Sequence, residues 1–114
     1  PTKCNILDPE PITVHIAEGA FDILGIFYHL CNANRYQNLY INCGDKAYFN
    51  VIKMLILDYG LINCKFNIYI DNDVDPRSVY INTLGREAHM IRNVFPGEKD
   101  FGVTPDRIKL QYLY

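Results

Sequence analysis

Short apolar segments typical of β-strands alternate along the chain with segments of helical periodicity, and this order limits the fold more than any other feature. The strand-like segments ITVHIAEG, NLYINCG and KFNIYID cover residues 12–19, 38–44 and 65–71 and are rich in β-branched or aromatic residues. Between them, residues 20–33 and 45–60 repeat apolar side chains at the three- and four-residue spacing of a helix. Such alternation predicts an α/β fold, with a parallel sheet, right-handed crossovers and covering helices.

The helix predicted over residues 45–60 has the most regular pattern in the chain. Asp45 can cap its start, and Gly60 can end it as a C-cap glycine. Its apolar stripe consists of Tyr48, Val51, Ile52, Leu55, Ile56 and Tyr59. The helix predicted over residues 20–33 ends at asparagines 32 and 34. Its expected apolar face consists of Phe21, Leu24, Phe27, Tyr28 and Cys31.

The second half of the chain is predicted to contain one more helix and one more strand. Residues 76–91 are expected to form a helix with Pro76 in its first turn, weakened near its middle by Gly85. A short fourth strand is expected within residues 92–97. Residues 98–114 are expected to form a loop followed by an element of undetermined type.

The chain length of 114 residues suits one domain with a single hydrophobic core. We interpret residues 1–11 as a proline-rich lead-in segment, residues 12–103 as the domain, and residues 104–114 as a C-terminal extension. The chain starts at Pro1 and stops directly after an apolar stretch. This pattern indicates a domain excised from a longer protein, or processing of the initiator.

Charge and cysteine content restrict the partners and the compartment. The net charge is −2, so a nucleic-acid partner would require a local basic face or a bridging cation. No signal peptide and no apolar run long enough to span a bilayer is present, so no membrane partner is expected. The four cysteines form no CxxC pair and no zinc spacing, which favours free thiols and a cytoplasmic location.

Acidic residues follow two of the predicted strands. Asp71, Asp73 and Asp75 come directly after the third strand, and Glu18 ends the first. If these strands are neighbours, Glu18 and Asp71 lie side by side at the carboxyl edge of the sheet, and Asp73 projects to the same side. Mg²⁺ or Mn²⁺ would relieve the repulsion between these carboxylates. The alternative is a solvated acidic turn in which Asp71 or Asp73 caps the next helix.

Four segments, in this order, resemble the toprim domain, the metal-binding catalytic module of bacterial-type primases and several topoisomerases. The segments are AEGAFDIL, YINCG, IYIDND and PGEKDFG, and the resemblance runs from about Ile12 to Val103. The resemblance implies a Rossmann-like toprim fold, with about four parallel strands sandwiched between helices. The segments VDPRS after the third strand and DKAY after Gly44 depart from the cellular primase pattern, which suggests a divergent phage or viral relative.

The resemblance implies a role for each matching residue. Asp71 and Asp73 would hold one or two cations, and Glu18 would be a metal ligand or the general acid/base, so these three are the expected catalytic residues. The alternative for Glu18 is to accept backbone N–H bonds at a helix start. Gly19 and Gly44 would let the backbone approach a phosphate, unless they are ordinary turn glycines.

Further residues are expected around this centre. Asp22 would orient the site through hydrogen bonds, or it is only a favourable charge near a helix start. Asp75 is expected to be a cap or an outer neighbour, and Asp100 to complete the acidic cluster. The expected phosphate contacts are Lys46, Arg77 and Lys99, with a loop salt bridge as the alternative for Lys99 and Asp100. His15 is expected to be a packed sheet residue, whereas His29 and His89 are expected on helices without pairing.

The resemblance favours a DNA primase, a nucleotidyltransferase that makes RNA primers on single-stranded DNA from nucleoside triphosphates with Mg²⁺ or Mn²⁺. The KDFG segment is the reason to favour primase, and a replicative helicase would be a further partner. The alternatives are a toprim-type metal-dependent nuclease, a non-catalytic nucleic-acid-binding module, and a small Rossmann-like domain without metal. The domain alone can lack activity, because its charge balance offers little basic surface for a template.

Overall fold

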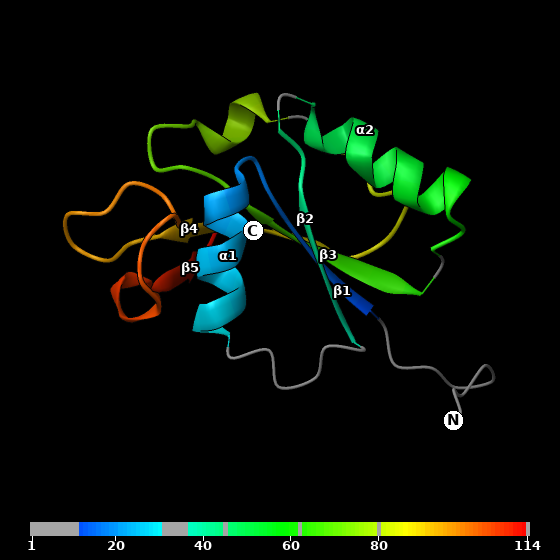
Figure 1. The fold of residues 1–114 in the computed structure, drawn as a ribbon. Coiled ribbons are helices and arrows are strands. Elements are labelled where there is room, and N and C mark those ends of the chain that lie inside the picture. The colour runs from blue at the N-terminus through cyan, green and yellow to red at the C-terminus, as the bar shows by residue number, and fades with distance from the viewer. Residues whose placement is uncertain (1–11, 31–36, 45, 62, 80, 114) are drawn as a thin grey trace.

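The computed structural model describes residues 12–30, 37–44, 46–61, 63–79 and 81–113, and they form a five-stranded sheet with helices (Figure 1). The strands are β1 (Ile12–Ala17), β2 (Asn38–Asn42), β3 (Cys64–Tyr69), β4 (Ala88–Asn93) and β5 (Leu110–Tyr112). Their order in the sheet is β2-β1-β3-β4-β5. The first four strands pair in parallel and β5 pairs antiparallel to β4. The predicted α/β class is therefore confirmed, and the predicted parallel sheet is present in β1 to β4 but has an additional antiparallel strand, β5.

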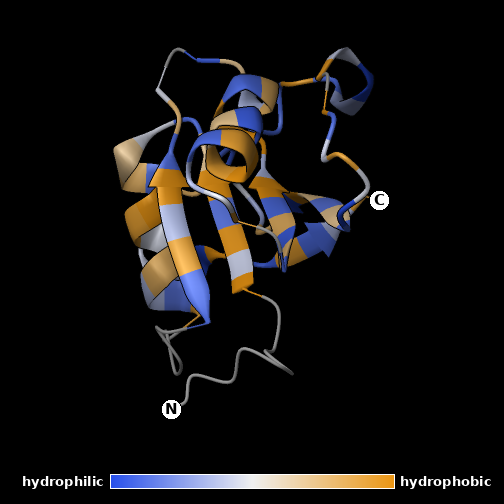
Figure 2. Cartoon of the chain, turned by 90° about the vertical axis from the view of Figure 1, so that its right-hand side faces the viewer, coloured by the Kyte–Doolittle hydropathy of each residue, from blue (hydrophilic) through white to orange (hydrophobic). Residues whose placement is uncertain are grey.

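Each face of the sheet has its own hydrophobic core. Val14 and Ile16 of β1 belong to the core that also contains α2 (Tyr48–Lys53) and its continuation, a π-helical segment (Met54–Asp58). Ala17 belongs to the opposite core, together with Ile26 of α1 (Ala20–His29). This division follows from the period-two alternation of side chains along a strand. Figure 2 shows the resulting alternation of hydrophobic and polar residues along the strands.

The helix predicted over residues 45–60 is present from residue 48 onward. Its Val51, Ile52, Leu55 and Ile56 are buried as expected, whereas Tyr59 is exposed. The chain leaves the helix through Gly60, which has a φ of +69° and serves as the predicted left-handed terminus. The predicted cap, Asp45, lies outside the described residues.

The apolar face predicted for α1 is wrong. Phe21 is 80% exposed, and Leu24 and Tyr28 are exposed as well, while Gly25 and Ile26 form the buried face. The helix turns this face inward because Gly25 lies against the backbone of residues 101–103. A glycine carries no apolar signal, so the periodicity pointed to the wrong side of the helix. Cys31 and asparagines 32 and 34 lie outside the described residues.

The predicted helix over residues 76–91 is also wrong. Pro76–Ser78 form a single 3-10 turn, and the described residues between this turn and β4, 79 and 81–87, form no helix. A tight turn interrupts the segment, where Leu84 and Gly85 have positive φ values of 51° and 89° and the Leu84 amide donates to Asn82 Oδ1. Val79 and Ile81 pack against the α2 core, so this irregular segment covers the sheet where a helix was expected.

The last strands also differ from expectation. The fourth strand begins at Ala88 rather than within residues 92–97, and the undetermined element near the C-terminus is β5. Ile108, in the predicted extension, is 5% exposed and belongs to the α1 core. The extension is therefore packed onto the domain.

The histidines and cysteines follow the predictions only in part. His15 is buried as predicted, with Nδ1 2.7 Å from the Tyr69 hydroxyl and Nε2 2.8 Å from Asn38 Oδ1. His89 lies on a strand and pairs with Glu87, and His29 Nδ1 lies 2.9 Å from the Pro105 carbonyl, so their expected lack of pairing is wrong. Cys43 and Cys64 are free and buried. Among the described residues, no helix is both long enough and apolar enough to cross a membrane.

Candidate functional site

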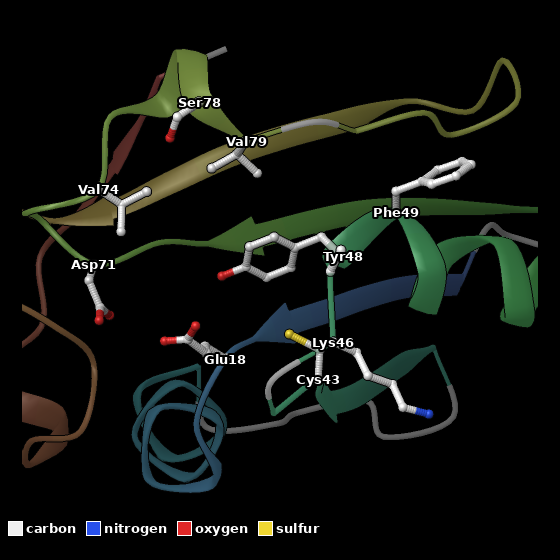
Figure 3. A pocket seen from close by; sticks show the side chains of 10 residues that line it. Glu18, Cys43, Lys46, Tyr48, Phe49, Asp71, Val74, Ser78 and Val79 are labelled. Atoms are coloured by element: carbon white, nitrogen blue, oxygen red, sulfur yellow. The ribbon is translucent and has the colours of Figure 1, made fainter.

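The candidate site lies at the carboxyl edge of the sheet, where the strand order reverses. From β1 the chain proceeds to β2 on one side, and β3 pairs with β1 on the other side. This point is where ligands bind in open α/β sheets. Glu18 follows β1 and Asp71 comes two residues after β3, and both side chains line one pocket (Figure 3). The predicted approach of these two acids is therefore confirmed.

Three carboxylates from three different elements converge beside this pocket. Asp22 comes from the first turn of α1, Asp71 from the end of β3, and Asp100 from the loop after β4. One oxygen of each lies within 4.8 Å of the other two. We call this set the acidic triad. Glu18 and Asp73, the other two expected ligands, are outside the triad and are exposed.

Asp22 is positioned by close packing of α1 against the loop that carries Asp100. The Phe101 amide donates a 3.0 Å hydrogen bond to Asp22 Oδ1. A Cβ on Gly25, one turn later, would lie 2.0 Å from the Phe101 carbonyl oxygen, so only glycine permits this approach. A Cβ on Gly19 would lie 2.9 Å from Asp22 Oδ2, so this glycine leaves room for the carboxylate.

Asp100 is positioned by a buried side-chain amide, Asn93, which was not among the residues predicted from the sequence. Asn93 is fully buried, and its Nδ2 donates to the carbonyls of Asp100 and Arg107 at 2.9 and 3.1 Å. Its Oδ1 accepts from the amides of Phe95 and Lys109 at 3.1 and 2.9 Å. All four hydrogen-bonding positions of the amide are used. The one sequence signal was an asparagine at the end of a strand.

A second amide, Asn72, joins the loop to β3. Its backbone N–H donates to the Lys99 carbonyl at 2.8 Å, and its Nδ2 donates to the carbonyls of Asn93 and Glu98 at 2.8 and 2.9 Å. Because Asn72 follows Asp71 directly, these bonds fix the loop carrying Asp100 relative to the strand end carrying Asp71. The triad geometry therefore depends on two asparagines.

The electrostatics of the triad favour a bound cation. Burial, reinforced by the charges of Asp22, Asp100, Glu18 and Asp73, raises the pKa of Asp71 to about 6. Burial is also the main cause that raises the pKa of Asp22. Within the described part of the chain, the Asp71 carboxylate accepts no hydrogen bond, and the three ion pairs involve Asp75, Glu87 and Glu98 instead. A hard divalent cation with oxygen ligands would balance this charge.

The expected phosphate contacts lie at the edge of the site. Arg77 pairs with Asp75 at 3.3 Å, and Asp75 Oδ1 also accepts from the Arg77 amide at 3.0 Å, so the predicted cap role of Asp75 is confirmed. These bonds to Arg77 lower the pKa of Asp75. Lys99 is exposed beside Asp100, and the ion pair of this loop joins Arg107 to Glu98 rather than involving Lys99.

The remaining expected phosphate contacts border the second strand. Lys46 lines the pocket, but its ammonium extends away from the two carboxylates in Figure 3. Gly44 has a φ of +62°, and a Cβ there would meet nothing within 4 Å, so its backbone is open to an approaching group.

The pocket has a volume of about 490 Å³ and two chemically different walls. Glu18 and Asp71 form an acidic wall, and Val79 and the ring of Tyr48 form an apolar wall across from it, with the Tyr48 hydroxyl pointing toward the carboxylates and Val74 lying next to Asp71 (Figure 3). Cys43, Lys46, Ala47, Phe49 and Ser78 complete the lining. The pocket is therefore suited to a ligand with a polar end and an apolar body.

Comparison of the chain with protein-family models, with curated proteins and with solved structures finds no match.

Proposed function

We propose that the chain is a toprim-type catalytic domain that uses Mg²⁺ or Mn²⁺ for nucleotidyl transfer, with primer synthesis on single-stranded DNA as its function. One observation carries the proposal: the half-buried Asp71 has no hydrogen-bond donor among the described residues, yet two further carboxylates lie within 4.8 Å of it. Such an arrangement is unfavourable without a cation. The order of the four toprim-like segments supports the choice of reaction.

The donor set fits the proposed metal. Three carboxylate oxygens from Asp22, Asp71 and Asp100 match the preference of Mg²⁺ for hard oxygen ligands, and the open edge leaves room for phosphate oxygens. The bound metal would supply activation of a 3′ hydroxyl and charge stabilisation at the reacting phosphorus. Asp22 and Asp100 thus take ligand roles in this proposal, whereas they were expected only to support the site.

Two acids outside the triad have different roles in the proposal. Glu18 lies beside Asp71 on the acidic wall of the pocket and is placed to accept a proton from the attacking hydroxyl or to hold a second cation. Asp73 is exposed two residues beyond Asp71 and contributes charge rather than a ligand atom to the triad. Nucleoside triphosphates and template DNA are the proposed partners, with a replicative helicase as a further proposed partner.

Metal binding is the first test, because it does not require template binding. Titration of the chain with Mn²⁺ by calorimetry should show binding that Asp71→Asn abolishes and that Asp75→Asn leaves within about twofold. Asp75 is a suitable control because its carboxylate pairs with Arg77. Failure of the native chain to bind Mn²⁺ in the presence of a nucleotide would overturn the metal centre.

The reaction is tested by incubating the full-length protein with single-stranded template, nucleoside triphosphates and Mg²⁺. The proposal expects short RNA products that disappear in Asp71→Asn. Cleavage of the template without synthesis would replace the primase assignment by that of a nuclease using the same acids. The protein could instead bind the template without synthesis or cleavage, and Asp71→Asn could leave this binding unchanged. That result would show that the chain is a non-catalytic nucleic-acid-binding module.

A further inference from the structure

We infer that the pocket beside Asp71 binds the base and sugar of a nucleotide whose phosphate lies at the acidic triad. The position of the phosphate rests on the proposed function, whereas the recognition of base and sugar rests on the pocket itself. The pocket volume of about 490 Å³ lies within the range of roughly 300–1,000 Å³ typical of small-molecule sites.

The two walls together select the ligand class. The acidic wall of Glu18 and Asp71 repels anions and favours hydroxyl or amine donors. The apolar wall opposite, with Val79 and the ring of Tyr48, favours a flat body of low polarity. A free sugar lacks the apolar body, and a simple hydrocarbon lacks the donors. A nucleoside has both, because its ribose carries hydroxyl donors and its base has apolar faces.

The apolar wall is held in place before any ligand binds. The Tyr48 hydroxyl donates to the Tyr69 carbonyl at 3.2 Å, which fixes the ring over the end of β3. In the loop after Asp71, Arg92 Nη2 donates to the Val74 carbonyl at 3.1 Å, and Ser78 Oγ donates to the Asp75 carbonyl at 2.7 Å, so this part of the lining is also held in place. A preformed wall lowers the entropic cost of binding.

Polar contacts for a base are available at the rim. The Ser78 hydroxyl already donates, so its oxygen is left as an acceptor for an exocyclic amino group. Glu18 is exposed at the opposite wall and can accept from ribose hydroxyls. Asp71 belongs both to this pocket and to the triad, so the sugar and the reacting phosphate would lie next to each other.

The test uses nucleosides without phosphate, in the absence of metal. Ligand-observed NMR should detect adenosine or guanosine binding to the native chain, and ribose and p-cresol should each bind at least about tenfold more weakly. Ser78→Trp places a large ring at the rim and should weaken nucleoside binding by about tenfold or more. Leu57→Trp introduces the same ring at an exposed site on the π-helical segment and should leave binding unchanged.

The outcomes separate this inference from the proposed function. Native Mn²⁺ binding without nucleoside binding would overturn the pocket assignment and leave the metal centre intact. Nucleoside binding without Mn²⁺ binding would support the pocket and overturn the metal centre. Equal binding of p-cresol and adenosine would overturn the assignment to a nucleoside. If Ser78→Trp fails the check for folding by circular dichroism, Val74→Phe, which narrows the same pocket, provides the second variant and is expected to give the same loss.

Discussion

Asp71 lies at the candidate metal site, where its surroundings disfavour the negative charge of its carboxylate. The effect of this charge on the free energy of unfolding can therefore be tested. The pKa of Asp71 is raised from the usual 3.8 to about 6, mainly by burial. In metal-free protein the folded state therefore keeps its proton at a pH where the unfolded state has lost it. The free energy of unfolding should fall as pH rises from about 4 to about 6 and level off above that range.

We expect Asp71→Asn to stabilise the metal-free chain at pH 7. The raised pKa corresponds to about 3 kcal/mol before screening and about 1 kcal/mol once the partial exposure of the carboxylate is allowed for. Urea denaturation with a chelator present, at pH 4 and pH 7, would measure the difference. The two proteins should be nearly equal at pH 4. A variant less stable than the native chain at pH 7 would show that the Asp71 charge is favourably paired.

Asn93 has no direct part in the proposed chemistry, but the position of Asp100 depends on it. Asn93→Leu would leave four part-buried backbone groups without their partner, at a cost of about 3 kcal/mol. The same change should weaken Mn²⁺ binding, because it releases the loop carrying Asp100. Asn50→Leu, at an exposed position on α2, is the matched control and should change stability by less than about 0.5 kcal/mol. Unchanged unfolding of Asn93→Leu would contradict the positioning role.

At the level of elements, the contact between α1 and the loop after β4 predicts a reversal of ordinary helix propensity. Gly25→Ala would normally stabilise a helix by about 1 kcal/mol. Here the added methyl would lie 2.0 Å from the Phe101 carbonyl, so we expect a loss of about 1–3 kcal/mol and displacement of Asp22 from the triad. Thermal unfolding and Mn²⁺ titration would measure the two effects.

Gly102→Ala is the control for the stability part of this prediction. A Cβ at residue 102 would have its nearest neighbours at 3.5 Å, which is ordinary van der Waals contact. The variant should therefore unfold within about 0.5 kcal/mol of the native chain. Equal stability of Gly25→Ala and Gly102→Ala would contradict the prediction, because it would show that α1 can move away from the loop after β4.

The elements also explain which parts of the site the sequence could predict. Glu18 and Asp71 follow buried strands, so the rule that parallel strands end at one edge brought them together correctly. Asp22 and Asp100 meet Asp71 through a loop held by two asparagines and through a glycine contact. Such contacts depend on tertiary packing and leave no periodic pattern. The sequence therefore predicted where the site lies. However, the metal ligands expected from the sequence, Glu18, Asp71 and Asp73, are not the three residues of the acidic triad.

The erroneous helix over residues 76–91 has a similar cause. Apolar residues at helical spacing were present, but turn-forming residues around Gly85 broke the segment. The residues from Ala88 onward instead pair in parallel with β3. In β4, Met90 and Ile91 are buried on opposite faces of the sheet. Pairing with a distant strand outweighed the local pattern.

For the whole molecule, the sheet order predicts that the C-terminal segment is needed for folding. The domain was predicted to end at residue 103, yet β5 extends the sheet beyond β4, and Ile108 is buried in the α1 core. Two backbone bonds, Val94 N–H to the Lys109 carbonyl at 2.8 Å and Leu113 N–H to the Met90 carbonyl at 2.7 Å, join this segment to the domain.

Removal of residues 104–114 should therefore cost several kcal/mol, because it exposes the α1 core, unpairs the edge of β4 and deprives Asn93 of two partners.

Ile108→Ala isolates the core contribution and should cost about 2–5 kcal/mol, whereas Gln111→Ala, at an exposed position on β5, should have little effect. Thermal unfolding followed by circular dichroism would rank the three variants. If residues 1–103 unfold cooperatively at the same temperature as the full chain, then β5 and Ile108 are dispensable and the domain ends at residue 103, as predicted from the sequence. If the shortened chain loses its cooperative transition while Ile108→Ala keeps it, strand pairing at β4 rather than core burial is what makes the segment necessary.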